Sequence, residues 1–307
     1  MCAATLATLT IRRAQESDRA DIESIAGQIW RGMDYLPMMF DRWLADAEGA
    51  FYIAEFEDRV VGTAKLSRLS DGEWWLEGLR VHPDLQGQGI GRRLHHAAIE
   101  QALQIGSGVL RFSTDEDYPP THHYAAETGF VRLRNYLLYE TRAYSNQFGA
   151  DTFHALTAAE VPSARNFLTH SALYEYVHHS TLGRQWKAYQ ITDERLLHWA
   201  ADQLLYGWHA TNSAHALSGL AILGGAALYP SGRTEMDVIY LDAEQGRLAQ
   251  IARSIRGLAA RLGYDRLRHM LPVAPDRLVA LEQGGWRRPK DNRGRAVLFG
   301  RSLDASG

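Results

Sequence analysis

The chain has 307 residues, 46% of them hydrophobic and 10% aromatic, with a formal net charge of −3 and a pI near 6.5. This length suits about two domains of roughly 150 residues each, and the composition excludes a disordered chain. The charge provides no basic field for nucleic acid or an anionic membrane. The longest nearly apolar stretch, 216–229, falls short of the roughly 20 residues that a membrane span needs. With one cysteine, Cys2, and no signal-peptide pattern, we expect a cytoplasmic protein without disulfides.

The first half of the chain alternates predicted strands with predicted helices. Strands are predicted at 9–13, 51–56, 60–69, 74–81, 109–113 and 136–141. Helices are predicted after the capping residues 16–18 and over 91–105 and 121–128. Residues 57–59 join the second and third strands as a hairpin. This order predicts an α/β layer structure, with a mixed, mostly antiparallel twisted sheet flanked by helices.

The second half repeats this order of elements. Gly219 stands in its predicted hairpin where Gly62 stands in the first, 157 residues earlier. Gly285, followed by Trp286, corresponds to Gly129, which is followed by Phe130, at an offset of 156 residues. Two independent landmarks that agree to one residue indicate a tandem duplication. We therefore predict domains at 1–145 and 146–307, with the joint near 143–151.

A glycine-rich turn between a predicted strand and a predicted helix carries the chemical signal. It has the sequence Val-His-Pro-Asp-Leu-Gln-Gly-Gln-Gly-Ile-Gly-Arg-Arg over 81–93. Glycines let a ligand approach backbone N–H groups closely, and these groups lie at a helix N-terminus, which favours an anion. Counted from Gly87, the dinucleotide and P-loop fingerprints both require a glycine where Arg92 stands, so both fail.

The turn instead fits Q/R-x-x-G-x-G/A, and with the preceding Val-His-Pro it resembles the coenzyme A signature of the GNAT acetyltransferase superfamily. The resemblance extends from Ile11 to Tyr139 and implies an N-acetyltransferase that uses acetyl-CoA. It implies that the pyrophosphate binds the backbone of Gln86, Gly87, Gln88, Gly89, Ile90, Gly91 and Arg92. It also implies that the pantetheine arm pairs with Leu79, Arg80 and Val81, and that the amide near Val81 polarises the thioester carbonyl. An ordinary tight turn without a ligand is the alternative.

Acetyl transfer to an amine needs a general base close to the thioester. Strand alternation places Glu73, Trp75, Glu77 and Leu79 on one face. In the GNAT family an acid or histidine that deprotonates the substrate often stands four residues before the position of Val81, which makes Glu77 the first candidate and Glu73 the second. Either carboxylate could instead pair with an arginine.

The resemblance also places a tyrosine, as general acid, four residues before the glycine of the Gly-Phe pair, and here that position is Ala125. Tyr124 is adjacent, although one helical residue rotates a side chain by about 100°. Tyr124, Tyr118 or His123 are the candidate replacements, with water as a further one.

The second half lacks the glycine turn, since Asp242 and Glu244 stand where a phosphate would bind, and we predict that it does not bind CoA. Asp237 mirrors Glu77. Trp208, His209 and Tyr240 contribute to a substrate cleft or belong to the second domain's core. No spacing of histidines and acids predicts a metal site.

We thus expect direct acetyl transfer in a ternary complex onto a primary amine, either a small molecule or a peptide, by a monomer whose two halves form a pseudo-dimer. The alternatives are a non-catalytic acyl-CoA-binding sensor or scaffold and, third, a structural interaction protein. Neither nucleic acid nor a membrane is expected as a partner.

Overall fold

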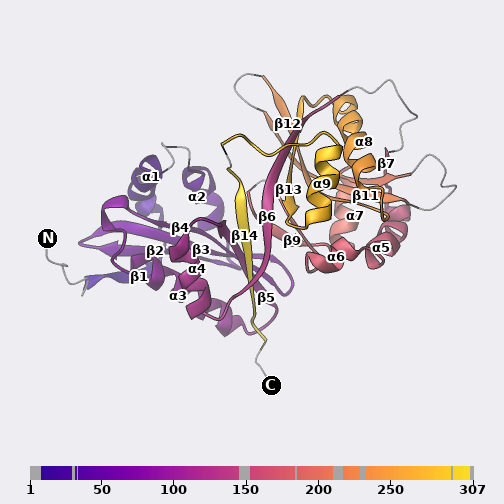
Figure 1. Ribbon diagram of the computed structural model, residues 1–307. Coiled ribbons are helices and arrows are strands. Elements are labelled where there is room, and N and C mark those ends of the chain that lie inside the picture. Colours follow the sequence, from indigo (N-terminus) through magenta and orange to yellow (C-terminus); the bar gives the residue numbers. More distant parts are fainter. Residues whose placement is uncertain are drawn as a thin grey trace. The chain divides into compact units, whose positions relative to one another are not determined.

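A computed structural model describes residues 8–29, 32, 34–144, 153–183, 185–209, 217–228, 232–291 and 293–304 (Figure 1). The chain divides into two compact units, and each is assembled from more than one stretch of sequence. Unit 1 comprises Met1–Phe112, Pro119–Val131 and Phe299–Gly307, and unit 2 comprises Ser113–Tyr118 and Arg132–Leu298. The predicted joint at 143–151 falls largely on residues 145–152, outside the described residues, so that boundary stays a prediction.

Unit 1 holds a sheet whose first five strands follow the order of the chain. The strands are β1 (Thr10–Arg13), β2 (Ala50–Phe56), β3 (Arg59–Ser70), β4 (Glu73–Val81) and β5 (Val109–Asp115, to Phe112 in this unit). Neighbours are antiparallel except β4 and β5, which are parallel. Glu57 and Asp58 have positive φ angles of 50° and 59°, which turn β2 into β3 as the predicted hairpin.

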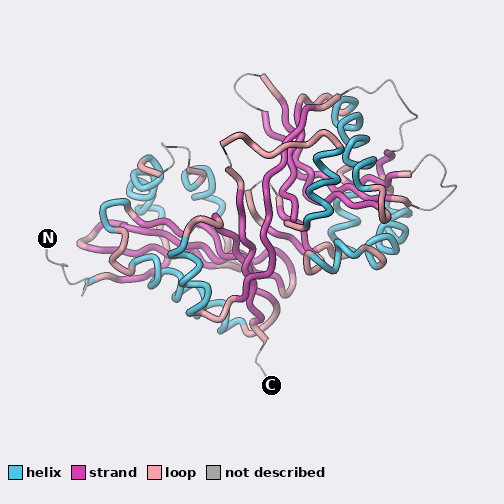
Figure 2. Tube along the Cα trace, in the orientation of Figure 1, coloured by secondary structure: helices cyan, strands magenta, loops and turns pink. Residues whose placement is uncertain are grey.

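Helices cover both faces of this sheet (Figure 2). They are α1 (Arg19–Gly27), α2 (Leu36–Leu44), α3 (Ile90–Ile105) and α4 (Pro119–Glu127). Phe51 and Ile53 of β2 pack with α1 and α2, whereas Ala54 packs with Ile90 and Leu94 of α3. The period-2 alternation of β2 therefore buries both of its faces. The C-terminal end of β14 (Arg295–Ser302) completes the unit, and its Phe299 stacks on Phe112 with ring centroids 5.2 Å apart.

Unit 2 repeats the architecture. Its sheet has the order β6 (Val131–Arg142), β13 (Arg266–Pro272), β12 (Thr234–Ala243), β11 (Gly219–Leu228), β10 (Leu205–Trp208) and β7 (Phe153–Ala155). The β12–β13 pair is parallel and the other neighbouring pairs in this order are antiparallel, as in unit 1.

Two hydrophobic clusters cover the faces of the unit 2 sheet. One includes α5 (Val161–Thr169), α6 (Ala172–Tyr176) and α7 (Asp193–Ala201), and the other includes α8 (Leu248–Arg261) and α9 (Pro275–Gln283). A short hairpin of β8 (Ser180–Leu182) and β9 (Ala188–Gln190) is added between α6 and α7. The predicted fold class, a mixed α/β sheet flanked by helices in two tandem domains, is confirmed.

Candidate active site

The glycine turn leaves β4 through a short 3-10 turn, Pro83–Leu85, and leads directly into α3. The side chain of Gln86 folds back and donates a hydrogen bond to the carbonyl of Val81 at 3.2 Å. Gly87 and Gly89 have φ angles of +76° and +83°, and a Cβ added to either meets no described atom within 4 Å. Backbone conformation, rather than lack of space, therefore requires glycine at these two positions.

The first turn of α3 presents unpaired backbone N–H groups. Within the described residues no side chain caps this helix, because its N-cap is Gly89. The first intrahelical bond runs from the Arg93 N–H to the Gly89 carbonyl at 3.1 Å. The N–H groups of Ile90, Gly91 and Arg92 would need carbonyls that precede the helix, so they lack intrahelical acceptors. Together with the helix dipole they form a site suited to an anion.

Two arginines at this helix start have different surroundings. Arg92 is 55% exposed, and its Nε donates to Glu127 of α4 at 2.9 Å. Arg93 donates to the carbonyl of Leu9 at 2.7 Å. Arg92, which the sequence assigns to the phosphate site, thus has a carboxylate of α4 as its neighbour.

A β-bulge in β4 determines which side chains face which helices. The register passes from Thr63 opposite Arg80 to Lys65 opposite Glu77, so β4 carries one extra residue there. Gly78 lies in this bulge with φ +65°, its carbonyl accepts a bond from Thr63 Oγ1 at 2.7 Å, and a Cβ on it would be 2.6 Å from Trp43. Glycine is required here by both conformation and space.

The bulge overturns the prediction that one face of β4 carries both Glu77 and Leu79. Leu79 packs against the hydrophobic cluster that contains Ile90 and Leu94 of α3. Glu77 instead lies close enough to Tyr35, which precedes α2, to influence its titration. The extra residue breaks the alternation, so Glu77 stays on the α2 side while Leu79 turns toward α3.

Glu77 is half-buried in a polar group of residues. Ser67 Oγ donates to Glu77 Oε1 at 2.7 Å. Burial raises the pKa of the Tyr35 hydroxyl, the Arg80 guanidinium opposes that rise, and the Glu77 carboxylate adds to it. Arg80 is centred 5.4 Å from the Tyr35 ring and donates to the buried Asp34 at 2.6 Å.

Glu73 has a different environment from Glu77. Its side chain is 1% exposed and forms a buried ion pair with Arg111 of β5 at 3.1 Å, and Ser70 donates to its other oxygen at 3.1 Å. The parallel register of β4 with β5 joins Glu73–Trp75 to Val109–Arg111. Glu73 therefore lies in the part of β4 that pairs with β5, whereas Glu77 lies beyond the end of that pairing.

The structure separates the candidates for the general acid. Ala125 is fully buried on α4. The Tyr124 ring lies over the start of α3, since a Cβ on Gly91 would be 3.8 Å from its Cε2 and 3.5 Å from Val81. His123 is 70% exposed and pairs with Glu127, and Tyr118 is an exposed residue of unit 2. Tyr124 is thus the candidate that contacts the turn.

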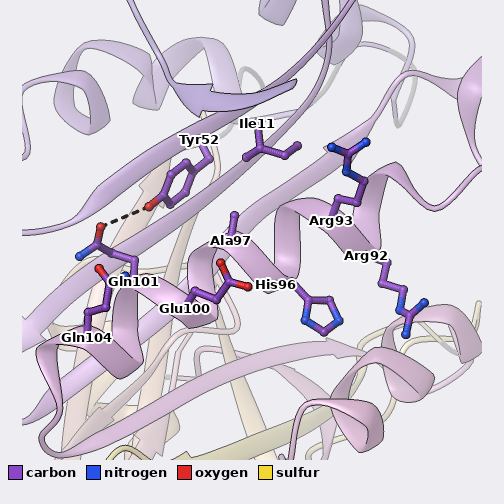
Figure 3. Close-up of a pocket in the computed structure, with 9 residues that line it drawn as sticks. All are labelled: Ile11, Tyr52, Arg92, Arg93, His96, Ala97, Glu100, Gln101 and Gln104. Carbon is purple, nitrogen blue, oxygen red and sulfur yellow. Dashed lines mark hydrogen bonds between the residues drawn. The ribbon is translucent and has the colours of Figure 1, made fainter. Parts of the chain in front are cut away.

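A surface groove of about 560 Å³ is lined by residues of α3, β1 and β2 (Figure 3). It is lined by Ile11, Tyr52, Arg92, Arg93, His96, Ala97, Glu100, Gln101 and Gln104. It meets the glycine turn through its two arginines, and Glu77 and Tyr124 are not among its lining residues. The groove is therefore distinct from the predicted catalytic residues.

The buried imidazole of His95 on α3 should make the stability of unit 1 depend on pH. The imidazole is buried against Phe112 and Phe130, and burial, aided by the charge of His96, lowers its pKa from 6.5 to about 4. The unfolded chain binds this proton near pH 6.5, so stability is lost as the pH falls from there toward 4.

Because the folded protein binds this proton less readily than the unfolded chain, we expect the unfolding free energy to fall by about 3 kcal/mol from pH 7 to pH 4. Urea unfolding of the wild type and of His95→Gln at both pH values measures it, and the variant should lack this part of the acid destabilisation. Equal acid destabilisation of both proteins would contradict the assignment to His95.

The corresponding region of unit 2 is occupied by its own side chains. Asp242, at the end of β12, accepts bonds from Arg277 of α9 at 2.8 Å and from Ser171 at 2.5 Å. Trp208 and Tyr240 are buried in the two cores of unit 2, which agrees with their alternative as core residues. His209 stacks on His154 with ring centroids 4.9 Å apart.

In the part of the chain that the structure describes, no three His, Cys, Asp or Glu side chains are grouped so as to hold a metal ion. None of the helices described here combines the length and the apolar character that crossing a membrane demands.

Comparison with known proteins identifies the family. Residues 18–130 match the acetyltransferase (GNAT) family. Histidine N-acetyltransferase of Oreochromis niloticus is 35% identical over 78 residues, covering 25% of this chain and 23% of that protein. Probable N-acetyltransferase 16 of Homo sapiens is 29% identical over 110 residues, covering 35% of this chain and 30% of that protein. The match thus spans less than a third of either relative.

Solved structures extend the likeness in fold to the whole chain. A GCN5-related N-acetyltransferase from Sphaerobacter thermophilus has a TM-score of 0.63 at 14% identity, with 97% of each chain covered. A tandem GNAT protein from the clavulanic acid biosynthesis pathway has a TM-score of 0.56 at 13% identity, covering 97% of this chain and 100% of that one. These likenesses show the tandem fold, and the chain carries a domain of the acetyltransferase (GNAT) family at residues 18–130.

Proposed function

We propose that unit 1 transfers an acetyl group from acetyl-CoA directly to a primary amine in a ternary complex. The observation that carries this proposal is the turn at Gln86–Gly91. Its left-handed glycines and the uncapped start of α3 present N–H groups on which a pyrophosphate fits. The backbone of Leu79, Arg80 and Val81, beyond the stretch of β4 that pairs with β5, would hold the pantetheine arm.

The half-buried carboxylate of Glu77 is the proposed base. It takes a proton from the attacking amine, directly or through water, as the nitrogen bonds to the thioester carbon. The amide near Val81 stabilises the developing oxyanion. As the carbon–sulfur bond breaks, the Tyr124 hydroxyl gives its proton to the thiolate. The buried ion pair of Glu73 with Arg111 supports a structural role for that carboxylate.

The acceptor is proposed to be a small molecule or peptide with a free amine. The name of the Oreochromis niloticus relative suggests screening free amino acids first, with L-histidine among them. We further propose one acetyl-CoA site per chain, because the Asp242–Arg277 pair stands at the counterpart of the turn in unit 2. A cytoplasmic monomer that needs no metal remains our expectation. The second candidate, a non-catalytic acyl-CoA sensor, is favoured by the buried Ala125 at the family's acid position.

Titration calorimetry with acetyl-CoA tests the proposed pyrophosphate site through alanine substitutions of two glycines in the turn. An alanine at φ +83° is strained by about 1–2 kcal/mol, so the free turn of Gly89→Ala should relax to another conformation. Binding must then restore the left-handed conformation, and we expect the Kd to rise about tenfold. Gly91→Ala is the matched control, because its Cβ would make ordinary contacts at 3.5 and 3.8 Å. We expect its Kd to stay within about twofold of the wild type.

The same titration reports the stoichiometry, which we expect to be one acetyl-CoA per chain. No binding by the wild type would refute both the enzyme and the sensor. Equal weakening by both alanine variants would contradict the role of the left-handed turn. Binding by the wild type is then followed by measuring thiol release with a panel of amines.

A further inference from the structure

The C-terminal end of α4 is fixed by a hydrogen-bonded cap. Gly129 has φ +75°, the Phe130 N–H donates to the Ala125 carbonyl at 3.0 Å, and the Gly129 N–H donates to Ala126 at 3.4 Å. This pair of bonds is the Schellman arrangement that ends a helix at a left-handed glycine. Thr128 is the last residue before that glycine, and Arg301 donates to its carbonyl.

The hydroxyl of Thr128 links α4 to α3 through His95. Thr128 Oγ1 lies 2.6 Å from the carbonyl of Tyr124, which can only accept, so the single hydroxyl proton points there. His95 Nε2 lies 3.1 Å from the same oxygen and must therefore be the donor. The chain of bonds thus runs from His95 on α3 through Thr128 to the backbone of Tyr124.

The ring of Tyr124 lies in the same contact region. Its centroid is 6.2 Å from that of His95, and its edge reaches the second residue of α3, Gly91. The ring of Tyr124 therefore lies next to α3, and its carbonyl is linked to α3 through Thr128 and His95. The rotation of α4 about its own axis then decides where the Tyr124 hydroxyl points.

That rotation matters because the tyrosine is one position from the family's acid position. One residue of helix turns a side chain by about 100°, and Ala125 at the usual position is buried. We infer that His95 and Thr128 are positioning residues for the Tyr124 hydroxyl. This inference rests on the proposed function, in which that hydroxyl protonates the departing thiolate.

The test is a double-mutant cycle between Thr128 and Tyr124. Thr128→Val keeps the shape and removes the hydroxyl, whereas Thr128→Ser keeps the hydroxyl. Each change is made in the wild type and in Tyr124→Phe, and kcat, KM for acetyl-CoA and Tm are measured with the best acceptor from the amine panel. A cycle isolates the interaction between two residues from the effect of either alone.

We expect Thr128→Val to lower kcat about tenfold with KM for acetyl-CoA unchanged, and Thr128→Ser to restore kcat to within about twofold of the wild type. A tenfold loss is smaller than the roughly 10²–10⁴-fold that proton transfer contributes, because the hydroxyl of Tyr124 is misplaced and not removed. In the Tyr124→Phe background, Thr128→Val should cause no further loss. His95→Gln, whose amide N–H can still donate to Thr128, should retain more kcat than His95→Leu at equal Tm.

Three results would overturn the inference. They are an unchanged kcat in Thr128→Val, an equal loss in both backgrounds, and a Tyr124→Phe variant as active as the wild type. If the wild type is active and the effects of the Thr128 and Tyr124 substitutions on kcat are additive, the positioning role is refuted and the proposed function is not. A wild type that binds acetyl-CoA and acetylates no amine refutes the proposed function itself.

Discussion

Glu77→Gln is expected to lower kcat for amine acetylation about 10³-fold while leaving the Kd for acetyl-CoA unchanged, since general base catalysis contributes about 10²–10⁴-fold. The amide keeps the size of the side chain and the bond with Ser67 but cannot take a proton at neutral pH. Because Glu77 faces the α2 side of β4 and the glycine turn leads into α3, cofactor binding should survive. Thiol release and calorimetry on the same preparation measure the two quantities.

Glu100→Gln is the matched control, because this carboxylate lines the groove along α3 and not the surroundings of Glu77. We expect its kcat within about twofold of the wild type, as for most surface substitutions. A Glu77→Gln variant that acetylates amines at the wild-type rate would remove Glu77 from the mechanism. A wild type that binds acetyl-CoA without turnover would favour the sensor instead.

The glycine turn could be predicted because its determinants are local. Left-handed backbone at Gly87 and Gly89 and the helix start that follows are encoded within a few residues. The repeat of the fold was likewise visible, since each half carries its own order of strands and helices. By contrast, α2 was missed although Leu36, Phe40 and Trp43 recur at helical spacing and are buried.

The face of β4 on which Glu77 lies could not be predicted from strand alternation alone. A glycine inside a predicted strand is a known sign of a bulge, so Gly78 held a signal that would have separated Leu79 from Glu77. The partner of Glu73 could not be predicted, because Arg111 is 38 residues away and meets it through the parallel strand pair. The placement of Phe299–Gly307 in unit 1 is non-local for the same reason.

Arg111→Met is expected to destabilise unit 1 by about 3–5 kcal/mol, because it removes the positive charge of Arg111 from the buried ion pair with Glu73. The two side chains are 4% and 1% exposed, so little water reaches the charge that remains. Trp74 and Trp75 adjoin Glu73 and are themselves buried, which makes tryptophan fluorescence during urea unfolding a direct measurement of this loss.

The double variant Glu73→Gln with Arg111→Met separates charge burial from packing. Replacing both members of a buried pair is often nearly neutral, so we expect it to recover more than half of the loss in Arg111→Met. Where it is folded, Glu73→Gln should keep its kcat, in contrast to Glu77→Gln. If folded Glu73→Gln instead lost turnover as Glu77→Gln is expected to, the base would be Glu73. The two carboxylates of one strand are thus distinguished by which measurement each substitution changes, kcat for Glu77 and unfolding free energy for Glu73.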